Sequence, residues 1–96
     1  MKQPKKFIYD SLNSFTIVDG QTHTLSVKEN LFLKILIEQK RLITYSEIES
    51  QVYQHKDMSQ NALRLFIKNL RKKLPKDYLL NVTNIGYKIN PDSAEY

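Results

Sequence analysis

Hydrophobic residues alternate with polar residues in short runs near the start of the chain. Residues 7–12 and 15–18 favour β-structure, and Asp19-Gly20 joins the second run to residues 21–25. An Asp-Gly pair between two such runs predicts a two-residue hairpin, because both central positions need positive φ. The chain is therefore predicted to begin with three short antiparallel strands.

The hydrophobic spacing then changes to that of helices. Ser26 followed by Glu29 is a capping box, which predicts a helix from there to about Gln39. Its inward residues are expected to be Val27, Leu31, Phe32, Ile35 and Leu36, with Leu33 and Ile37 widening the apolar stripe. So wide a stripe predicts a central helix that is covered on several sides.

A second capping box, Thr44 with Glu47, predicts a shorter helix anchored by Ile48 and Val52. The preceding Leu42-Ile43 is expected to be extended, and residues 54–58 are expected to form a loop.

A third helix is predicted from about Gln60 to Leu74, where Pro75 should end it. Its apolar residues are spaced i, i+4, i+7 and i+11, namely Leu63, Ile67, Leu70 and Leu74. Two β-favouring runs follow, at 78–82 and 87–89, around a turn in which Asn84 and Gly86 can take positive φ. The chain should therefore close with a β-hairpin.

Strands, three helices and a hairpin in this order predict an α+β fold, a winged helix-turn-helix. The second and third helices form the helix-turn-helix, and the C-terminal hairpin forms the wing. Residues 1–6 are read as a basic lead, 7–90 as the domain and 91–96 as a flexible tail.

The composition is that of one ordinary globular domain, with 96 residues, 41% hydrophobic and 26% charged. Without cysteine there is no disulfide framework or thiolate metal site, which fits a reducing compartment. The longest apolar run, 31–37, is short and interrupted by Lys34, so no membrane span is expected. Residues 1–6 lack the apolar segment of a signal peptide. A cytoplasmic location is expected.

The net charge of +5 is concentrated in two segments. Residues 59–76 carry six Lys or Arg and no acid, and residues 1–6 add three more cations. A solvated helix face is the simple alternative, but such helices usually place Glu four residues from Lys. An uncompensated basic helix favours an anionic partner.

The polar face of the third helix predicts contact with double-stranded DNA in the major groove. Its residues are Asn61, Arg64, Leu65, Lys68, Asn69, Arg71 and Lys72. Arg64, Lys68 and Arg71 are the strongest candidates. An arginine can form two parallel hydrogen bonds with guanine or with a phosphate, and a lysine supplies a positive charge on a flexible side chain. Each alternative remains open: the cations can be solvated, Asn61 can be a local cap, and isolated exposed leucines are common.

Weaker candidates lie elsewhere. Thr44, Tyr45 and Ser46 begin a helix, where free N–H groups suit a phosphate, although Thr44 can simply be the cap. Lys88 in the hairpin can reach a phosphate or be solvated. His23 and His55 are far apart without paired ligand spacing, so no metal is expected. The chain has no recognisable nucleophile–base constellation or phosphate loop, so neither catalysis nor a cofactor is expected.

These residues resemble the winged-helix effector domain of OmpR/PhoB-type response regulators, which belong to bacterial two-component systems. Residues 25–29 resemble the family's Leu-Thr-x-x-Glu, and residues 42–48 resemble its Val-Val-Ser-Arg-Glu-x-Leu. Residues 67–74 resemble its Ile-x-x-Leu-Arg-Lys-Lys-Leu, and residues 85–88 resemble the end of its Arg-Gly-x-Gly-Tyr-Arg wing. The resemblance covers roughly residues 7–90.

The resemblance implies transcriptional regulation by promoter binding, with helix 60–74 in the major groove and wing 78–89 at the minor groove. It implies wing contacts near Thr83 and Asn84, and head-to-tail pairing on direct repeats. It also implies that the loop between the second and third helices contacts RNA polymerase, here through Gln54, His55, Lys56 and Asp57.

The chain departs from the family pattern at several positions. Thr83 and Asn84 stand where the wing usually has arginine and glycine, and Asn61 stands where arginine is common. Losing the wing cation leaves open a protein-interaction module that docks an acidic partner; RNA binding is a weaker alternative. The sequence has no room for a receiver domain, so it is either an excised effector domain or a stand-alone regulator.

Overall fold

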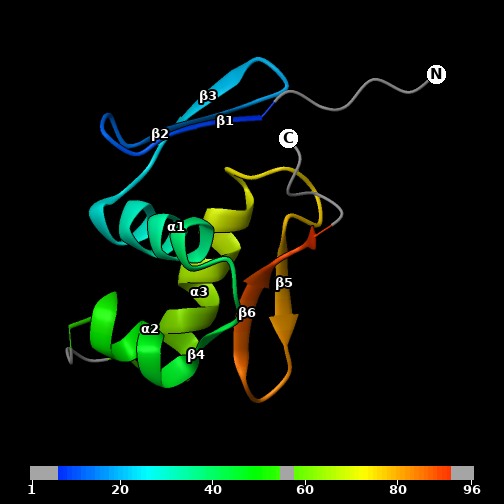
Figure 1. Cartoon of the computed structure of the whole chain (residues 1–96). Coiled ribbons are helices and arrows are strands. Elements are labelled where there is room, and N and C mark those ends of the chain that lie inside the picture. Colours follow the sequence, from blue (N-terminus) through cyan, green and yellow to red (C-terminus); the bar gives the residue numbers. More distant parts are fainter. Residues whose placement is uncertain (1–6, 55–57, 92–96) are drawn as a thin grey trace.

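The computed structural model describes residues 7–54 and 58–91, and its N-terminal part is a three-stranded antiparallel sheet (Figure 1). The strands are β1 (Phe7–Asp10), β2 (Phe15–Val18) and β3 (Gln21–Thr24), in the order β1-β2-β3. Asp19 and Gly20 have φ of 51° and 84°, which confirms the predicted hairpin.

Helix α1 (Val27–Gln39) starts at the predicted capping box, with both of its hydrogen bonds formed. Phe32, Leu33 and Leu36 are completely buried, as a central helix requires. The prediction for Val27 was wrong, since this side chain is 84% exposed. Val27 is nine residues from Leu36, and at about 100° per residue it points to the opposite side of the helix.

Strand β4 (Ile43–Thr44) leads into α2 (Tyr45–Gln51), which begins at the second predicted capping box. Ile48 and Val52 are buried, as predicted. Helix α3 (Gln60–Arg71) starts at Ser59, whose hydroxyl accepts a hydrogen bond from the Ala62 N–H.

Helix α3 ends earlier than predicted, at Arg71 rather than Leu74. The N–H groups of Lys73 and Leu74 bond to the carbonyls three residues back, which tightens the last turn. Pro75 also disfavours helical geometry at Leu74. Leu74 nevertheless stays in the core, at 6% exposure, so its hydrophobic position was read correctly.

The C-terminal hairpin pairs β5 (Leu79–Val82) with β6 (Gly86–Ile89), and β4 joins it in a sheet of order β4-β6-β5. Asn84 has φ of 64°, as predicted, but Gly86 does not have positive φ. Glycine is needed there for close approach instead: a Cβ on Gly86 would lie 2.0 Å from the Ile43 carbonyl oxygen.

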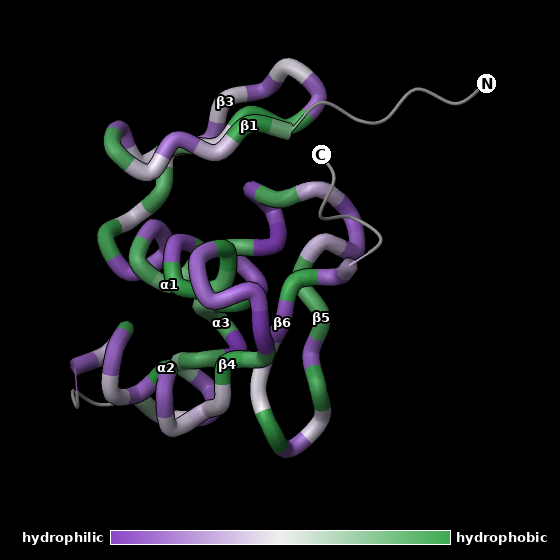
Figure 2. The backbone as a smooth tube through the Cα atoms, in the orientation of Figure 1, coloured by the Kyte–Doolittle hydropathy of each residue, from purple (hydrophilic) through white to green (hydrophobic). Residues whose placement is uncertain are grey.

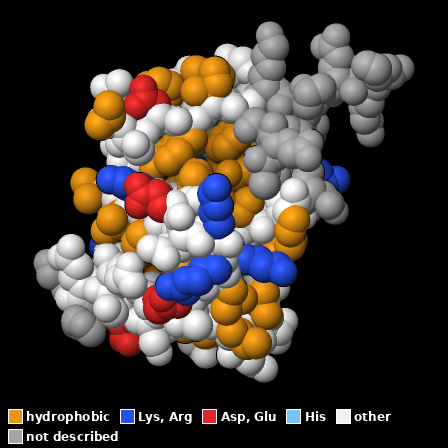
Figure 3. All heavy atoms as spheres, in the orientation of Figure 1, with side chains coloured by type: hydrophobic (Ala, Val, Ile, Leu, Met, Phe, Trp, Pro, Cys, Tyr) orange, Lys and Arg blue, Asp and Glu red, His pale blue; other side chains and the backbone are white. Residues whose placement is uncertain are grey.

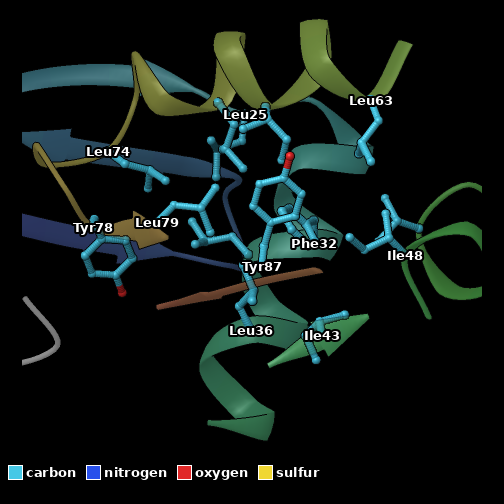
Figure 4. Close-up of a cluster of buried hydrophobic side chains, with 14 of the residues drawn as sticks. Leu25, Phe32, Leu36, Ile43, Ile48, Leu63, Leu74, Tyr78, Leu79 and Tyr87 are labelled. Carbon is cyan, nitrogen blue, oxygen red and sulfur yellow. The ribbon is translucent and has the colours of Figure 1, made fainter. Parts of the chain in front are cut away.

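One hydrophobic core joins the helices to both sheets (Figure 4). Hydrophobic and hydrophilic residues alternate along α3, as expected for a helix with one buried face (Figure 2). The predicted α+β winged helix-turn-helix is confirmed. No helix in the described part of the chain combines the length and hydrophobicity needed to cross a membrane.

Candidate nucleic-acid interface

Helix α3 presents a polar face to solvent because its hydrophobic residues are held in the core. Leu63, Ile67 and Leu70 are buried. Every residue predicted for the DNA-binding face is exposed, namely Asn61, Arg64, Leu65, Lys68, Asn69, Arg71 and Lys72. Leu65 is 59% exposed, so an apolar group lies among the cations and amides.

A hollow of ≈ 350 Å³ separates α3 from the wing, and we call it the wing groove. It is lined by Tyr45, Met58, Gln60, Leu63, Arg64, Asn81, Thr83, Asn84 and Tyr87. The structure therefore brings together Arg64 of α3 with Thr83 and Asn84 of the wing. At the root of the groove the Tyr45 hydroxyl lies 3.4 Å from Asn81 Oδ1.

Two hydrogen bonds fasten the wing to the helices. Arg71 Nη1 donates to the Leu79 carbonyl of β5 at 2.5 Å, and the Tyr45 N–H donates to the Ile85 carbonyl at 3.0 Å. Arg71 was predicted only as a DNA contact, and this bracing role was missed. No sequence signal could have revealed it, because it depends on how β5 lies against α3.

The start of α2 is occupied by the chain's own groups. Thr44 Oγ1 accepts a hydrogen bond from the Glu47 N–H at 3.2 Å, so Thr44 is the N-cap of α2. The Tyr45 N–H already donates to the Ile85 carbonyl of the wing. The Glu47 carboxylate bonds the Thr44 N–H at 3.0 Å and pairs with Arg41 at 2.5 Å. Hydrogen bonds from Arg41 and Thr44 lower the pKa of Glu47 to about 2. Among the three predicted residues here, only Ser46 is exposed.

Lys88 lies away from the wing groove. It lines another hollow with Lys40 and Arg41, and Figure 3 shows several Lys and Arg side chains close together on the face that carries α1 and β6. In the predicted polymerase-contact loop, Gln54 is exposed with φ of 53°. His55, Lys56 and Asp57 lie outside the described residues.

A third hollow, of ≈ 620 Å³, lies where the N-terminal sheet meets α3, and we call it the β3–α3 hollow. It is lined by His23, Ser26, Glu29, Phe66, Asn69, Lys72 and Lys73. Lys73 Nζ bonds the buried Glu29 carboxylate at 2.7 Å and the Thr24 carbonyl at 2.8 Å. Lys73 is therefore a structural cation, whereas Lys72 beside it is exposed.

The described residues contain no group of three or more His, Asp or Glu side chains arranged to hold a metal ion. The interface is built from cations, amides and apolar groups. Such groups suit contact with phosphates and base edges.

The sequence identifies the family. The model described as "Transcriptional regulatory protein, C terminal" matches residues 20–89. The chain belongs to this family of OmpR/PhoB-type DNA-binding domains, and it is a DNA-binding domain of transcriptional regulation. A comparison with curated proteins gives no significant match.

Solved structures share the fold. The C-terminal domain of the nisin resistance regulator NsrR is 24% identical with a TM-score of 0.69, over 86% of this chain and 89% of that one. The DNA-binding domain of Bacillus subtilis CssR is 18% identical with a TM-score of 0.74, over 88% and 100%. The DNA-binding domain of AdeR, solved in complex with an intercistronic region, is 21% identical with a TM-score of 0.71, over 93% and 98%.

Proposed function

We propose that this domain binds duplex DNA sequence-specifically, with α3 in the major groove and the β5–β6 wing at the adjacent minor groove. The observation that carries the proposal is the arrangement of α3: its predicted contact residues are all exposed, and Arg64 adjoins the wing across one groove. A half-buried helix with long cations on its free side fits the major groove.

The contacts divide by chemistry. Asn61, Leu65 and Lys68 lie centrally on the exposed face, with Arg64 and Asn69 on its two flanks, and we assign base edges to these five residues. Lys72 and the free N–H groups of Arg71 contact phosphates, as does Ser46 at the start of α2. Thr83 and Asn84 contact the minor groove, without the charge that an arginine would supply there.

The first test compares Arg64→Ala with Lys72→Ala on the tightest duplex from a random pool and on an unrelated duplex. Arg64→Ala should reduce the ratio of specific to random affinity about tenfold or more, because a forked base contact is lost. Lys72→Ala should weaken both duplexes alike and reduce the log–log salt slope by about 0.9. Fluorescence anisotropy at several salt concentrations measures both effects.

Lys34→Ala, on the exposed side of α1, is the matched control and should change neither quantity. Equal losses on both duplexes for Arg64→Ala would reject its base-reading role. If the unaltered domain selects no sequence at all, the alternative of a module for acidic protein partners gains support; Thr83 in the usual arginine position favours that alternative.

We also propose that the domain pairs head to tail on direct repeats and that residues 54–57 contact RNA polymerase. The family resemblance supports both proposals. The activity proposed is binding alone, without catalysis, and it takes place in the cytoplasm. Sedimentation with one-site and two-site duplexes tests the pairing, which requires cooperative binding of the second copy.

A further inference from the structure

The β3–α3 hollow lies on the opposite flank of α3 from the wing groove. Arg64 lines the wing groove, and Asn69 lines the β3–α3 hollow. These residues are five positions apart, so at about 100° per residue they point about 140° apart around the helix. The exposed face of α3 therefore runs between two hollows, and the wing lines only one of them.

A helix in the major groove has a phosphate backbone on each side of it, because the groove is bounded by both strands. With α3 placed there as proposed, the wing groove faces one of these backbones. The β3–α3 hollow adjoins the side of α3 that then faces the other backbone, and the residues that line it include His23 of β3, Asn69 and Lys72.

The charges of the hollow leave it cationic. Its one acid, Glu29, is buried and paired with Lys73, so these two charges offset each other. Neither the side-chain ammonium of Lys72 nor the imidazole of His23 has a hydrogen bond or ion pair to another described residue. Their donors are thus free to meet an anion.

We propose that the β3–α3 hollow binds a backbone phosphate of the DNA, through His23 and Lys72. The N-terminal sheet then takes part in DNA binding, and the contacted segment of the DNA strand extends beyond the bases that α3 contacts. This inference rests on the proposed placement of α3 in the major groove. It adds a contact from an element to which the family resemblance assigned no such role.

The test uses the tightest duplex from a random pool, with single methylphosphonate linkages placed at each position in turn. On the unmodified duplex, His23→Ala and Lys72→Ala should each lose about two- to tenfold in affinity, the value of one hydrogen bond or charge contact. Thr22→Ala, an exposed neighbour on β3, should bind as the unaltered domain does. His23→Arg adds a permanent cation and should raise the salt slope by about 0.9.

One methylphosphonate, outside the bases protected by α3, should weaken the unaltered domain but leave the His23→Ala/Lys72→Ala double variant unchanged. Thermal unfolding of each variant separates loss of contact from loss of structure, and His23→Arg gives a gain that misfolding cannot produce. If the double variant is as sensitive as the unaltered domain at every linkage, the hollow binds no phosphate. A domain that binds no duplex overturns the proposed function and this site with it.

Discussion

Gly86 shows how one residue sets the position of the wing. Its Cα faces the backbone of β4 so closely that an added Cβ would lie 2.0 Å from the Ile43 carbonyl oxygen and 2.8 Å from the Thr44 Cα. The sequence predicted positive φ for Gly86 as well as for Asn84, but in this turn only Asn84 has it. The reason for Gly86 is a contact between residues far apart in the chain, which local sequence patterns do not reveal.

Gly86→Ala should destabilise the domain by about 3 kcal/mol or more, because backbone atoms and not a flexible side chain oppose the new methyl group. Gly20→Ala is the matched comparison: nothing lies within 4 Å, and only its φ of 84° is unfavourable. That variant should cost about 1 kcal/mol. Urea unfolding measures both, and equal losses would contradict the steric explanation.

The helices show which element boundaries a sequence defines. Both capping boxes place the first residue of α1 and α2 correctly, because each is made by side chains only three positions apart. The end of α3 was not predictable in the same way, since the chain tightens before Pro75 while Leu74 still reaches the core. Helix starts here depend on local chemistry, and this helix end depends on packing.

The cap of α2 also predicts a pH dependence. Because the folded pKa of Glu47 is lowered from 4.5 to about 2, its contribution to stability is complete above pH 4.5 and is lost as the pH falls towards 2. In Glu47→Gln the side-chain amide oxygen can still accept the capping hydrogen bond, but the negative charge that pairs with Arg41 is lost. The stability difference from the unaltered domain should be below about 1 kcal/mol at pH 7, because the pair is exposed, and should shrink to near zero at pH 2.

Urea unfolding at pH 2, 3, 4.5 and 7 measures this difference. Glu49→Gln, exposed on the same helix, serves as the control. A difference for Glu47→Gln that stays constant across these pH values would show that the charge of Glu47 is not responsible.

At the scale of the whole molecule, the N-terminal sheet is held to the helices by the shared hydrophobic core and by a few polar contacts. Thr16 Oγ1 donates to the Lys73 carbonyl at 2.7 Å, the Tyr9 hydroxyl bonds the Asn30 carbonyl at 3.0 Å, and Lys73 pairs with Glu29. The basic face of α3 was predictable from charge and helical spacing. The exposure of Lys72 was predicted in the same way and is confirmed, whereas the role of Lys73 in this junction was not predictable, because it depends on how the sheet docks.

Lys73→Met should destabilise the domain by about 2–4 kcal/mol, because Glu29 is 5% exposed and would be left without its cation. Adding Glu29→Gln should recover part of the loss, since no buried charge then remains. Thermal unfolding measures each variant, and Lys76→Met, at an exposed position, should change stability by less than about 0.5 kcal/mol. No recovery in the double variant would show that the loss comes from packing alone.

The two hydrogen bonds that brace the wing have a consequence for the operator. Arg71 of α3 is joined to Leu79 and Tyr45 of α2 is joined to Ile85, so in the proposed complex the helices and the hairpin meet DNA in a fixed relative orientation. The protein then has little freedom to change the angle between them, so the duplex must adjust its own curvature to fit both. Preferred operators should therefore carry easily kinked TA or CA steps between the segment read by α3 and the segment beneath the wing, at positions that no side chain touches.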